Sequence, residues 1–330
     1  MTLRVGLLGL GYFAQFHRDG WTRIDGADLA VTADADPAKG ADVPTLEAML
    51  AQPLDIVDIA TPPPTHAAAI QTALAAAPKA IICQKPFCTS LEEATRMADL
   101  AEAAQVPLIV HENFRFQPWF RTIKAALDAG RIGTPLNVTF RLRPGDGQGP
   151  DAYLDRQPYF RQMPRLLLHE TGIHYLDVFR FLLGDPDGVY ADLRRLNPSI
   201  RGEDAGHVIL DYGSGARAVL DGNRLLDFDT DAPRRTFGEA LVEGDAGTLT
   251  LTGDGAVTFR AFGSQRHEVL LAATDWPGFA GDSVRALQLH VVEAVMGRGA
   301  FENRARDYLT AQHLCDLAYA SDGAKARLPL

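Results

Sequence analysis

The sequence predicts an α/β fold in two parts: an N-terminal doubly wound parallel sheet, and a C-terminal α+β part with helices and a large, mostly antiparallel open sheet. Two observations predict this fold. Through the first third of the chain, short apolar runs alternate with helical stretches at the spacing of parallel strands and crossover helices. Beyond it, strand-like runs follow one another, and glycine-rich turns such as Gly213-Ser-Gly215 suggest hairpins.

The length of the chain suits two domains, and its charge limits the classes of partner. Its 330 residues are too many for one average domain, and we place the two parts at residues 1–117 and 118–330. The chain has 32 Lys and Arg against 42 Asp and Glu, a formal net charge of −10. An acidic surface repels phosphate backbones and anionic lipids, so we expect neither nucleic acid nor membrane as a partner.

The cysteines and the N-terminus indicate a cytoplasmic protein. Cys83, Cys88 and Cys315 have neither metal-ligand spacing nor the pattern of a disulfide framework, so we expect buried, inert thiols. The first residues lead directly into an apolar strand, without the features of a signal peptide. No apolar run approaches the length that spans a bilayer.

Five strands are expected in the first part, and the first of them is a continuously apolar run, as in strands buried on both faces of a sheet. The five strands span residues 4–9, 28–33, 54–60, 80–83 and 107–111. Helical stretches at 65–77 and 90–105 lie among them. A ligand of such a sheet binds beyond the carboxyl ends of the strands. The residues that follow each strand are therefore the first candidates for a binding site.

A glycine turn follows the first strand and opens a helix that runs to about Asp25. Gly9 permits a tight turn, Gly11 lets the backbone approach a pyrophosphate, and Ala14 is small enough for close helix packing. The amides at the start of the helix then face the phosphate charge. We expect this turn, including Tyr12 and Phe13, to bind a dinucleotide.

Asp34 indicates which dinucleotide is bound. It ends the second strand, about 20 residues beyond the glycine turn, where a carboxylate accepts hydrogen bonds from the ribose hydroxyls and repels a 2′-phosphate. We therefore expect NAD rather than NADP. Asp36 is the rival residue for this role, but Asp36-Pro37 is typical of helix initiation, with Asp as the cap.

Two more loops are expected to contact the cofactor. Thr61 and Pro62 begin a proline-rich turn that ends at His66, which is either the first residue of a helix or a cofactor contact. Gln84 and Lys85 follow the fourth strand. From this position the lysine can donate to a reacting oxygen and favour a developing alkoxide.

Substrate residues are expected in two further segments. Asn113 and Arg115 follow the fifth strand, where they bind the nicotinamide end or a substrate hydroxyl, or else form a polar crossover loop. A glycine-punctuated loop at 144–150 leads to Tyr153, Arg156, Tyr159 and Arg161. Polar and aromatic side chains on such a loop suit a polyhydroxylated ligand, so we expect either a lid over the substrate or a disordered surface loop.

The second part is expected to contain five strands and four helices. The strands span residues 137–142, 207–212, 216–220, 239–243 and 248–252. The helices span residues 118–129, 165–183, 282–297 and 304–321. An open sheet face is a natural surface for oligomer formation.

The motifs together resemble those of the Gfo/Idh/MocA oxidoreductases, the glucose–fructose oxidoreductase and inositol dehydrogenase group, over nearly the whole chain. The resemblance is carried by Gly9–Ala14, Asp34-Ala-Asp-Pro37, Ala60-Thr-Pro-Pro-Pro-Thr-His66, Lys85-Pro86 and the segment from Glu170 to Gly184. It implies an N-terminal Rossmann domain, a C-terminal substrate and oligomerisation domain, and a homodimer or homotetramer formed through the C-terminal sheet. Two positions depart from the family pattern: Gln84 replaces a glutamate, and Glu170 replaces an aspartate.

The resemblance implies a catalytic site of lysine, acidic residue and histidine around the reactive carbon. Histidine is the side chain whose unperturbed pKa suits a base near pH 7, and His174 is the candidate. Glu170 lies one helical turn earlier and orients the imidazole, stabilises its charged form or binds a substrate hydroxyl. His169 and His174 are five residues apart, about 140° around a straight helix, so we expect no metal.

The function that follows is NAD-dependent oxidation of a hydroxyl of a sugar or polyol, with hydride transfer to nicotinamide C4. Family resemblance points to an aldose oxidised at C1 to its lactone, a pentose such as D-apiose, or to a ring alcohol of an inositol-like polyol. Two alternatives remain. One is a redox-neutral sugar-modifying enzyme that retains its NAD, and the other is a non-catalytic dinucleotide sensor.

Overall fold

The computed structural model describes residues 2–330, and the chain forms two compact units. The first contains the residues up to Phe116 together with Asp282–Thr310, and the second contains Gln117–Gly281 and Ala311–Leu330. This division differs from the expected one at residues 282–310, which pack with the first unit rather than the second.

The first unit is built on a five-stranded parallel sheet with the order β2-β1-β3-β4-β5. Its strands are β1 (Leu3–Leu8), β2 (Ala27–Ala33), β3 (Ile56–Ile59), β4 (Ala80–Gln84) and β5 (Leu108–His111). Its crossover helices are α1 (Ala14–Thr22), α2 (Leu46–Leu50), α3 (His66–Ala75) and α4 (Leu91–Ala103). The order reverses between β1 and β3, which makes the carboxyl ends of these two strands the topological switch point of the sheet.

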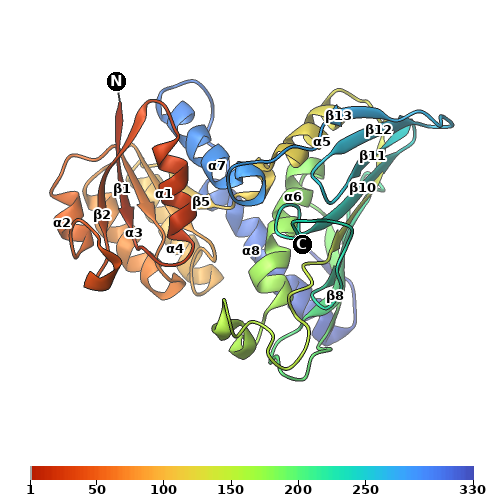
Figure 1. Ribbon diagram of the computed structural model, residues 1–330, viewed down its shortest axis with the longest axis horizontal. Helices are drawn as coiled ribbons and strands as arrows, with labels where there is room; N and C mark the ends of the chain where they lie inside the picture. The colour runs from red at the N-terminus through yellow and green to blue at the C-terminus, as the bar shows by residue number, and fades with distance from the viewer. Residues whose placement is uncertain (1) are drawn as a thin grey trace. The chain divides into compact units, whose positions relative to one another are not determined.

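Helices cover both faces of this sheet (Figure 1). On one face, Trp21 of α1 and Leu287 and Val291 of α7 (Phe279–Val295) share a core with Val5 and Ile82 of the strands. The burial of these apolar side chains is the reason that the 282–310 segment belongs to the first unit. Hydrogen bonds fasten it further, since the Asn303 amide donates to the main-chain oxygen of Glu112.

A charged cluster lies inside the first unit, in the middle of an otherwise apolar strand. Asp58 of β3 accepts a hydrogen bond from Trp21 Nε1 and lies 2.8 Å from Nδ1 of His17, and all three side chains are essentially inaccessible to solvent. The His111 ring lies 4.2 Å from the His17 ring. Burial alone would raise the pKa of Asp58, but the charge of His17 and the hydrogen bonds outweigh it, and the pKa is lowered.

Replacing Asp58 with asparagine is expected to lower the free energy of unfolding by about 3–5 kcal/mol at pH 7, because it leaves the buried partner uncompensated. Urea unfolding of both proteins measures this difference. Since the pKa of Asp58 is lowered in the folded state, its stabilisation is present above the unfolded value of about 4 and is lost as the pH falls through the folded value. The difference in the free energy of unfolding between the wild type and Asp58→Asn should therefore become smaller in acid. Asp99→Asn, at an exposed ion pair with Arg306, serves as the control and should unfold like the wild type.

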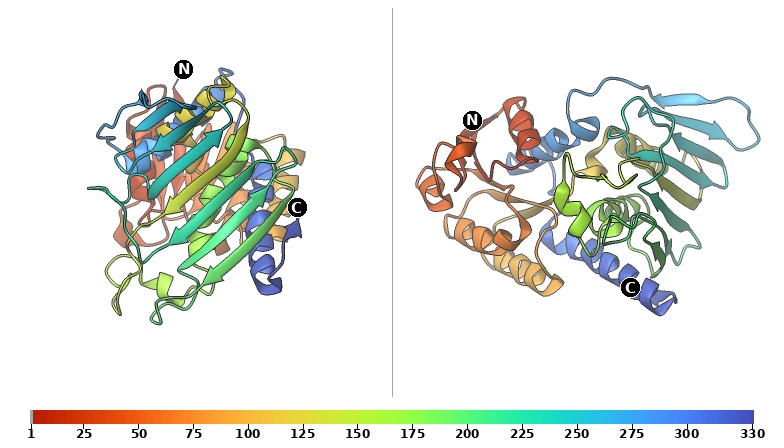
Figure 2. Two further views of the ribbon diagram at one scale, coloured as in Figure 1. Left: turned by 90° about the vertical axis from the view of Figure 1, so that its right-hand side faces the viewer. Right: turned by 60° about the horizontal axis from the view of Figure 1, so that its bottom comes forward.

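The second unit is built on a nine-stranded sheet with the order β13-β12-β11-β10-β6-β9-β8-β7-β14 (Figure 2, left). Only the β6–β9 pair is parallel. The strands are β6 (Pro135–Leu142), β7 (Gly188–Arg194), β8 (Ala205–Asp211), β9 (Arg217–Asn223), β10 (Gly238–Gly244), β11 (Gly247–Leu251), β12 (Val257–Ala261), β13 (Glu268–Leu271) and β14 (Leu328–Pro329). The predicted fold class is confirmed in both parts, although β7, β12, β13 and β14 were not expected.

Helices α5 (Pro118–Asp128) and α6 (Ile173–Leu183) pack against one face of this sheet, and α8 (Ala305–Ala324) precedes β14. The rings of Phe140 on β6 and Tyr175 on α6 are stacked with centroids 3.9 Å apart. On the opposite face, Leu241 of β10 is 38% exposed. Across residues 2–330, no helix is both long and apolar enough to cross a membrane.

The cysteines are buried and free, as expected. Burial raises the pKa of Cys88 to about 12, and it also raises the pKa of Cys83 and of Cys315. These thiols are therefore protonated and unreactive near neutral pH.

Candidate active site

The glycine turn lies at the topological switch point. Gly9 has φ +90°, and a Cβ at this position would lie 2.8 Å from the Thr61 side chain, so only glycine fits. A Cβ at Gly11 would meet no atom within 4 Å, which leaves space for a ligand next to the backbone. No side chain caps the start of α1, where the Ala14 and Phe16 amides donate to the main-chain oxygens of Gly11 and Phe13.

Three predicted residues of the turn have different environments. Ala14 is buried and allows the close packing expected of it. Tyr12 is 48% exposed. The Phe13 ring contacts the rings of Phe16 and His17, so its packing lies within the unit.

Asp34 connects the end of β2 to the glycine turn. Its Oδ2 atom accepts a hydrogen bond from the Leu10 amide at 2.6 Å, and its Oδ1 atom accepts one from the Asp36 amide at 2.8 Å. Each carboxylate oxygen can accept a second bond, which a ribose hydroxyl can supply. Asp36 instead caps the short helix Pro37–Lys39 by accepting from the Ala38 amide, which confirms its expected role in helix initiation.

His66 is the first residue of α3, one of the two roles left open for it, and its side chain is fully buried. Its Nε2 atom lies 2.7 Å from the main-chain oxygen of Thr61, and its Nδ1 atom lies 2.9 Å from that of Phe87. Burial lowers the pKa of His66, although these two carbonyls oppose the shift. His66 therefore joins the loop after β3 to the loop after β4, and acts on the site through these backbones.

Lys85 lies at the carboxyl end of β4, on the edge of the sheet that carries the glycine turn. Its side chain is half-buried, and its amide donates to Oε1 of Gln84 at 2.8 Å. Gln84 is 8% exposed. The neutral amide thus fixes the backbone before Lys85 in place of the acidic side chain that is usual in the resembled family.

The two predicted residues after β5 are held by residues of the 282–310 segment. The Asn113 amide, 2% exposed, donates to the Ser283 hydroxyl at 2.7 Å. Arg115 forms an ion pair with Glu302 at 3.9 Å. These contacts fit the polar crossover loop that we left open for this segment.

Glu170 and His174 lie on a helix that changes its winding between them. Residues Leu167–Gly172 form a π-helix, and α6 continues from Ile173. Such π-helical turns occur frequently at functional sites. His174 is 5% exposed and Glu170 is half-buried. The straight helix that we assumed for His169 and His174 is therefore wrong, although the described residues contain no group of three acidic, His or Cys side chains suited to a metal ion.

The expected lid is tied down at several points. Tyr153 is 7% exposed, and its hydroxyl accepts a hydrogen bond from Arg224 Nε at 2.7 Å. Arg224 is itself buried and pairs with Asp146 at 2.8 Å. Arg156, on the surface, reaches the same carboxylate at 3.3 Å. Tyr153 thus holds the loop together from inside.

The sequence interpretation did not select Arg224 as a site residue, and it included Tyr159 only as a side chain of the expected lid. Arg224 also donates to the Thr171 hydroxyl at 2.9 Å, next to Glu170, and so links the loop to the π-helix. Tyr159 is 57% exposed. Partial burial and the charge of Glu170 raise the pKa of Tyr159. The only sequence signal for Tyr159 was its position in a loop rich in aromatic and basic residues.

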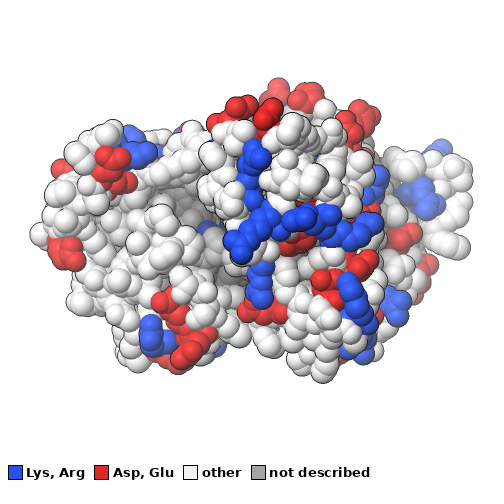
Figure 3. Space-filling view, turned by 90° about the horizontal axis from the view of Figure 1, so that it is seen from below, with Lys and Arg blue, Asp and Glu red and all other residues white. Residues whose placement is uncertain are grey.

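Arginines are concentrated in two segments of the second unit, 156–165 and 194–201. The segments are joined by the hydrogen bond from the Arg201 amide to the Arg161 carbonyl. The space-filling view from below shows Lys and Arg side chains in a continuous band (Figure 3). Arg165 pairs with Asp316. Within residues 2–330, Arg161 and Arg201 have no acidic partner.

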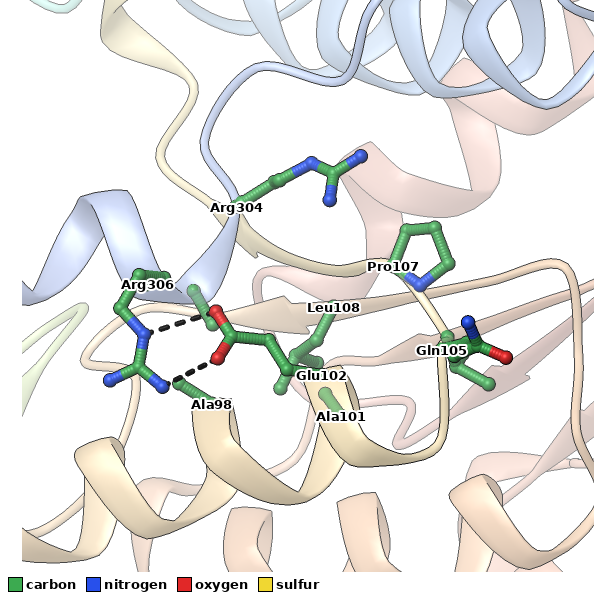
Figure 4. Close-up of a pocket in the computed structure, with 10 residues that line it drawn as sticks. Ala98, Ala101, Glu102, Gln105, Pro107, Leu108, Arg304 and Arg306 are labelled. Atoms are coloured by element: carbon green, nitrogen blue, oxygen red, sulfur yellow. Dashed lines mark hydrogen bonds and ion pairs between the residues drawn. The ribbon is translucent and has the colours of Figure 1, made fainter.

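A separate cavity of about 290 Å³ lies at the opposite edge of the first unit (Figure 4). Its lining includes Pro107 and Leu108 at the amino end of β5, together with Arg304. Arg306 faces Glu102 across one side of it and is paired with that carboxylate. Because dinucleotides bind at the carboxyl ends of such strands, this cavity is not the cofactor site.

Comparison with known proteins shows which family has this arrangement. The family model for the oxidoreductase family with an NAD-binding Rossmann fold matches residues 3–112, and that of the GFO/IDH/MocA C-terminal domain matches residues 120–250. A D-apiose dehydrogenase of Rhizobium rhizogenes is 34% identical, over 97% of this chain and 95% of its own length. An inositol 2-dehydrogenase of Rhizobium meliloti is 33% identical, over 70% and 72% of the two chains.

A solved structure is similar over the whole chain. It is an oxidoreductase from Agrobacterium radiobacter in complex with NAD⁺, L-tartaric acid and magnesium, with a TM-score of 0.89, 30% identity, and coverage of 100% of this chain and 98% of that one. The glycine turn at the switch point and Asp34 at the end of β2 have the chemistry that NAD requires. The chain therefore belongs to the Gfo/Idh/MocA family and is an NAD-binding oxidoreductase.

Proposed function

We propose that this enzyme oxidises a hydroxyl of a sugar or polyol, with His174 as the base. Bound NAD supplies the hydride acceptor, C4 of its nicotinamide ring. The hydride leaves the substrate carbon while His174 takes the proton from the hydroxyl oxygen, which leaves a carbonyl group, NADH and a protonated imidazole. Lys85 stabilises the oxygen as its negative charge develops. Glu170 orients the imidazole or binds a neighbouring hydroxyl.

The observation that carries this proposal is the position of Lys85 at the carboxyl end of β4, on the same sheet edge as the glycine turn. A protein that only sensed the dinucleotide would need no cationic donor there. In the second unit, His174 and Glu170 lie on one helix, and the charge of Glu170 acts on the exposed Tyr159. An aromatic ring beside polar groups suits the apolar face of a sugar and its hydroxyls.

The substrate that we favour is an aldose of pentose size, such as D-apiose, oxidised at C1 to its lactone. The relative of 34% identity, named a D-apiose dehydrogenase, supports this choice. A ring alcohol of an inositol-like polyol is the next candidate, supported by the inositol 2-dehydrogenase relative.

We further propose a homodimer or homotetramer through the open face of the C-terminal sheet, which light scattering of the purified protein would test.

A sugar that carries a carboxylate is a second candidate, favoured by one observation. The arginine-rich segments 156–165 and 194–201 lie in the unit that carries Glu170, and several of their guanidinium groups have no acidic partner among the described residues. In a protein of net charge −10, such a local excess of positive charge attracts an anion. The carboxylate of a uronic or aldonic acid would interact with this positive charge, whereas a neutral aldose has no group that would.

The test is absorbance at 340 nm with the purified enzyme, NAD or NADP, and a panel of aldoses, uronic acids and inositols. Growth of NADH with a member of the panel supports the dehydrogenase and identifies its substrate. Tight NAD binding without NADH formation from any member contradicts it and favours a redox-neutral reaction with retained cofactor, or a dinucleotide sensor. Product analysis of the same mixtures separates these two, because only the former changes the sugar.

Replacing Asp34 with serine is expected to raise the Kd for NADH about 10-fold or more and to improve the binding of NADPH relative to NADH. The substitution removes the acceptor for the ribose hydroxyls and the charge that repels a 2′-phosphate. Titration of nicotinamide fluorescence measures both constants. Asp28→Asn, near the amino end of the same strand, should leave both unchanged. Equal loss of NADH and NADPH binding in the Asp34 variant would mean that Asp34 only supports the glycine turn.

A further inference from the structure

The start of the helix that carries Glu170 and His174 is capped by residues distant in sequence. Four consecutive amides, those of residues 166–169, precede the first intrahelical hydrogen bond, which Glu170 N–H donates to the Leu166 oxygen. Such amides have no partner within their own helix. Leu166, at the N-cap position, has no side chain that could accept from them.

Glu203 accepts from three of these four amides. Its Oε2 atom accepts from the Leu166 amide at 3.2 Å, and its Oε1 atom accepts from the Leu168 amide at 3.0 Å. Its main-chain oxygen accepts from the Leu167 amide at 3.0 Å. One residue thus satisfies the helix start from a position more than thirty residues later in the chain.

Tyr319 binds the fourth of these amides. Its hydroxyl accepts from the His169 amide at 3.1 Å and donates its own proton to Oε1 of Glu203. The Arg165 guanidinium lies 4.3 Å from the centre of the Tyr319 ring. Burial and the charge of Glu203 raise the pKa of Tyr319, so its hydroxyl remains protonated and able to donate.

Glu203 is an unusual residue to find buried, because its side chain is a carboxylate. It is 8% exposed, and within residues 2–330 no Lys or Arg forms an ion pair with it. Its negative charge lies instead at the positive end of a helix, which is where a buried carboxylate is stabilised. An apolar core at this place would leave the helix amides without partners. The carboxylate is therefore matched to the start of this helix.

The carboxyl end of the π-helical turn is also held in place by contacts. Arg224 donates to the Thr171 hydroxyl, and the next residue, Gly172, is packed so closely that a Cβ would lie 2.7 Å from Leu168. The segment from Leu166 to Gly172 is thus held at both ends, and it contains Glu170 and directly precedes His174. An error of about 1 Å in such a segment is enough to misplace a catalytic group and can lower a rate about 100-fold.

We infer that Glu203, together with Tyr319, is a positioning residue that sets the placement of Glu170 and His174 by capping the π-helix that contains Glu170 and directly precedes the turn of His174. The inference rests on the proposed function for its effect on catalysis, but not for the cap itself. Glu203 acts through the helix backbone and touches neither substrate nor cofactor in this role. Its loss should therefore affect the chemical step more than the binding of NAD.

The cap is tested by hydrogen–deuterium exchange of the full chain, which needs no activity. In Glu203→Gln, the amides of Leu166 and Leu168, from which the carboxylate accepts, should exchange about 10-fold faster or more, and Tyr319→Phe should release the His169 amide. Glu239→Gln and Tyr212→Phe are matched controls in the same unit and should leave this segment unchanged. The Tyr212 hydroxyl is buried and has no hydrogen-bond partner within residues 2–330. Unchanged exchange in Glu203→Gln would overturn the inference.

The positioning role is tested by kinetics with the substrate found for the wild type. Glu203→Gln should lower kcat about 10- to 100-fold while KM and the Kd for NADH change less than about 3-fold. The isotope effect for substrate deuterated at the oxidised carbon should rise, because hydride transfer becomes slower than product release. Glu203→Asp, which keeps the charge, should recover part of kcat and provides a folded variant if Glu203→Gln does not fold.

The outcomes separate the two proposals. Faster exchange with wild-type kcat and isotope effect overturns the positioning role, since the cap would then be purely structural. A parallel loss of kcat and of NADH-binding sites at constant isotope effect also overturns it, because that pattern means a smaller folded fraction. If the wild type oxidises no sugar, the proposed function fails, and the exchange experiment alone decides whether Glu203 caps this helix.

Discussion

Replacing His174 with alanine is expected to lower kcat for sugar oxidation by about 10²- to 10⁴-fold, the usual contribution of a positioned general base. The Kd for NADH should stay near the wild-type value, because the glycine turn and Asp34 belong to the first unit and His174 to the second. Steady-state rates at 340 nm and a fluorescence titration of NADH measure the two quantities. Added imidazole should restore part of the rate by entering the space that the side chain leaves.

His169→Ala is the matched control for this experiment. His169 lies on the same π-helical segment and is half-buried, and its main-chain amide, which the substitution keeps, bonds to Tyr319. We expect a small change in kcat. Equal losses in both variants would mean that the substitutions disturb the helix rather than remove a base, and a nearly normal rate in His174→Ala would assign the base to another group.

The parallel sheet could be predicted from the sequence because its signal is local. Each of the five strands is a short, mostly apolar run, and the turn chemistry after β1, β3 and β4 marks the edge at which ligands bind. In the second unit, β12 and β13 carry little such signal. Both lie at one edge of the sheet and are largely half-buried or exposed, so their residues do not alternate between buried and exposed.

The position of α7 could not be predicted from the sequence. Its apolar residues indicate a buried helix, but a local pattern does not reveal which of two sheets buries it. The structure shows that Leu287 and Val291 pack with Val5 and Trp21, more than 250 residues away in sequence. Long-range packing of this kind decides the unit to which a segment belongs, and hydrophobic periodicity alone contains no information about it.

The site could be predicted only in part, for a similar reason. Lys85 and His174 lie in motifs that a single sequence displays. The residues that hold them do not: Arg224, Glu203 and Tyr319 reach the π-helix from 35 to 150 residues away. For the same reason Tyr153 was expected to face the substrate, although its hydroxyl bonds to Arg224. From the sequence alone, a polar side chain in a loop is equally suited to binding a substrate and to bonding with another side chain of the protein.

Replacing Lys85 with methionine is expected to lower kcat by about 10²- to 10³-fold, the loss typical of removing a donor to a developing oxyanion. Methionine keeps much of the volume of the lysine side chain but has no charge and no proton to donate. The loss should appear in kcat and kcat/KM together, because the alkoxide charge exists only in the transition state. NADH should still bind, since Asp34 and the glycine turn are intact, and a titration checks this.

Lys79→Met is the control for Lys85→Met, because the two lysines flank the same strand. Lys79 directly precedes β4 and pairs with Asp55 at the surface, whereas Lys85 follows β4 at the edge that carries the glycine turn. If the proposed chemistry is correct, charge removed at the amino end of β4 leaves kcat unchanged and charge removed at its carboxyl end nearly abolishes turnover. A large rise in KM with normal kcat in Lys85→Met would contradict the electrostatic role, because it would show that Lys85 binds the substrate and its transition state equally well.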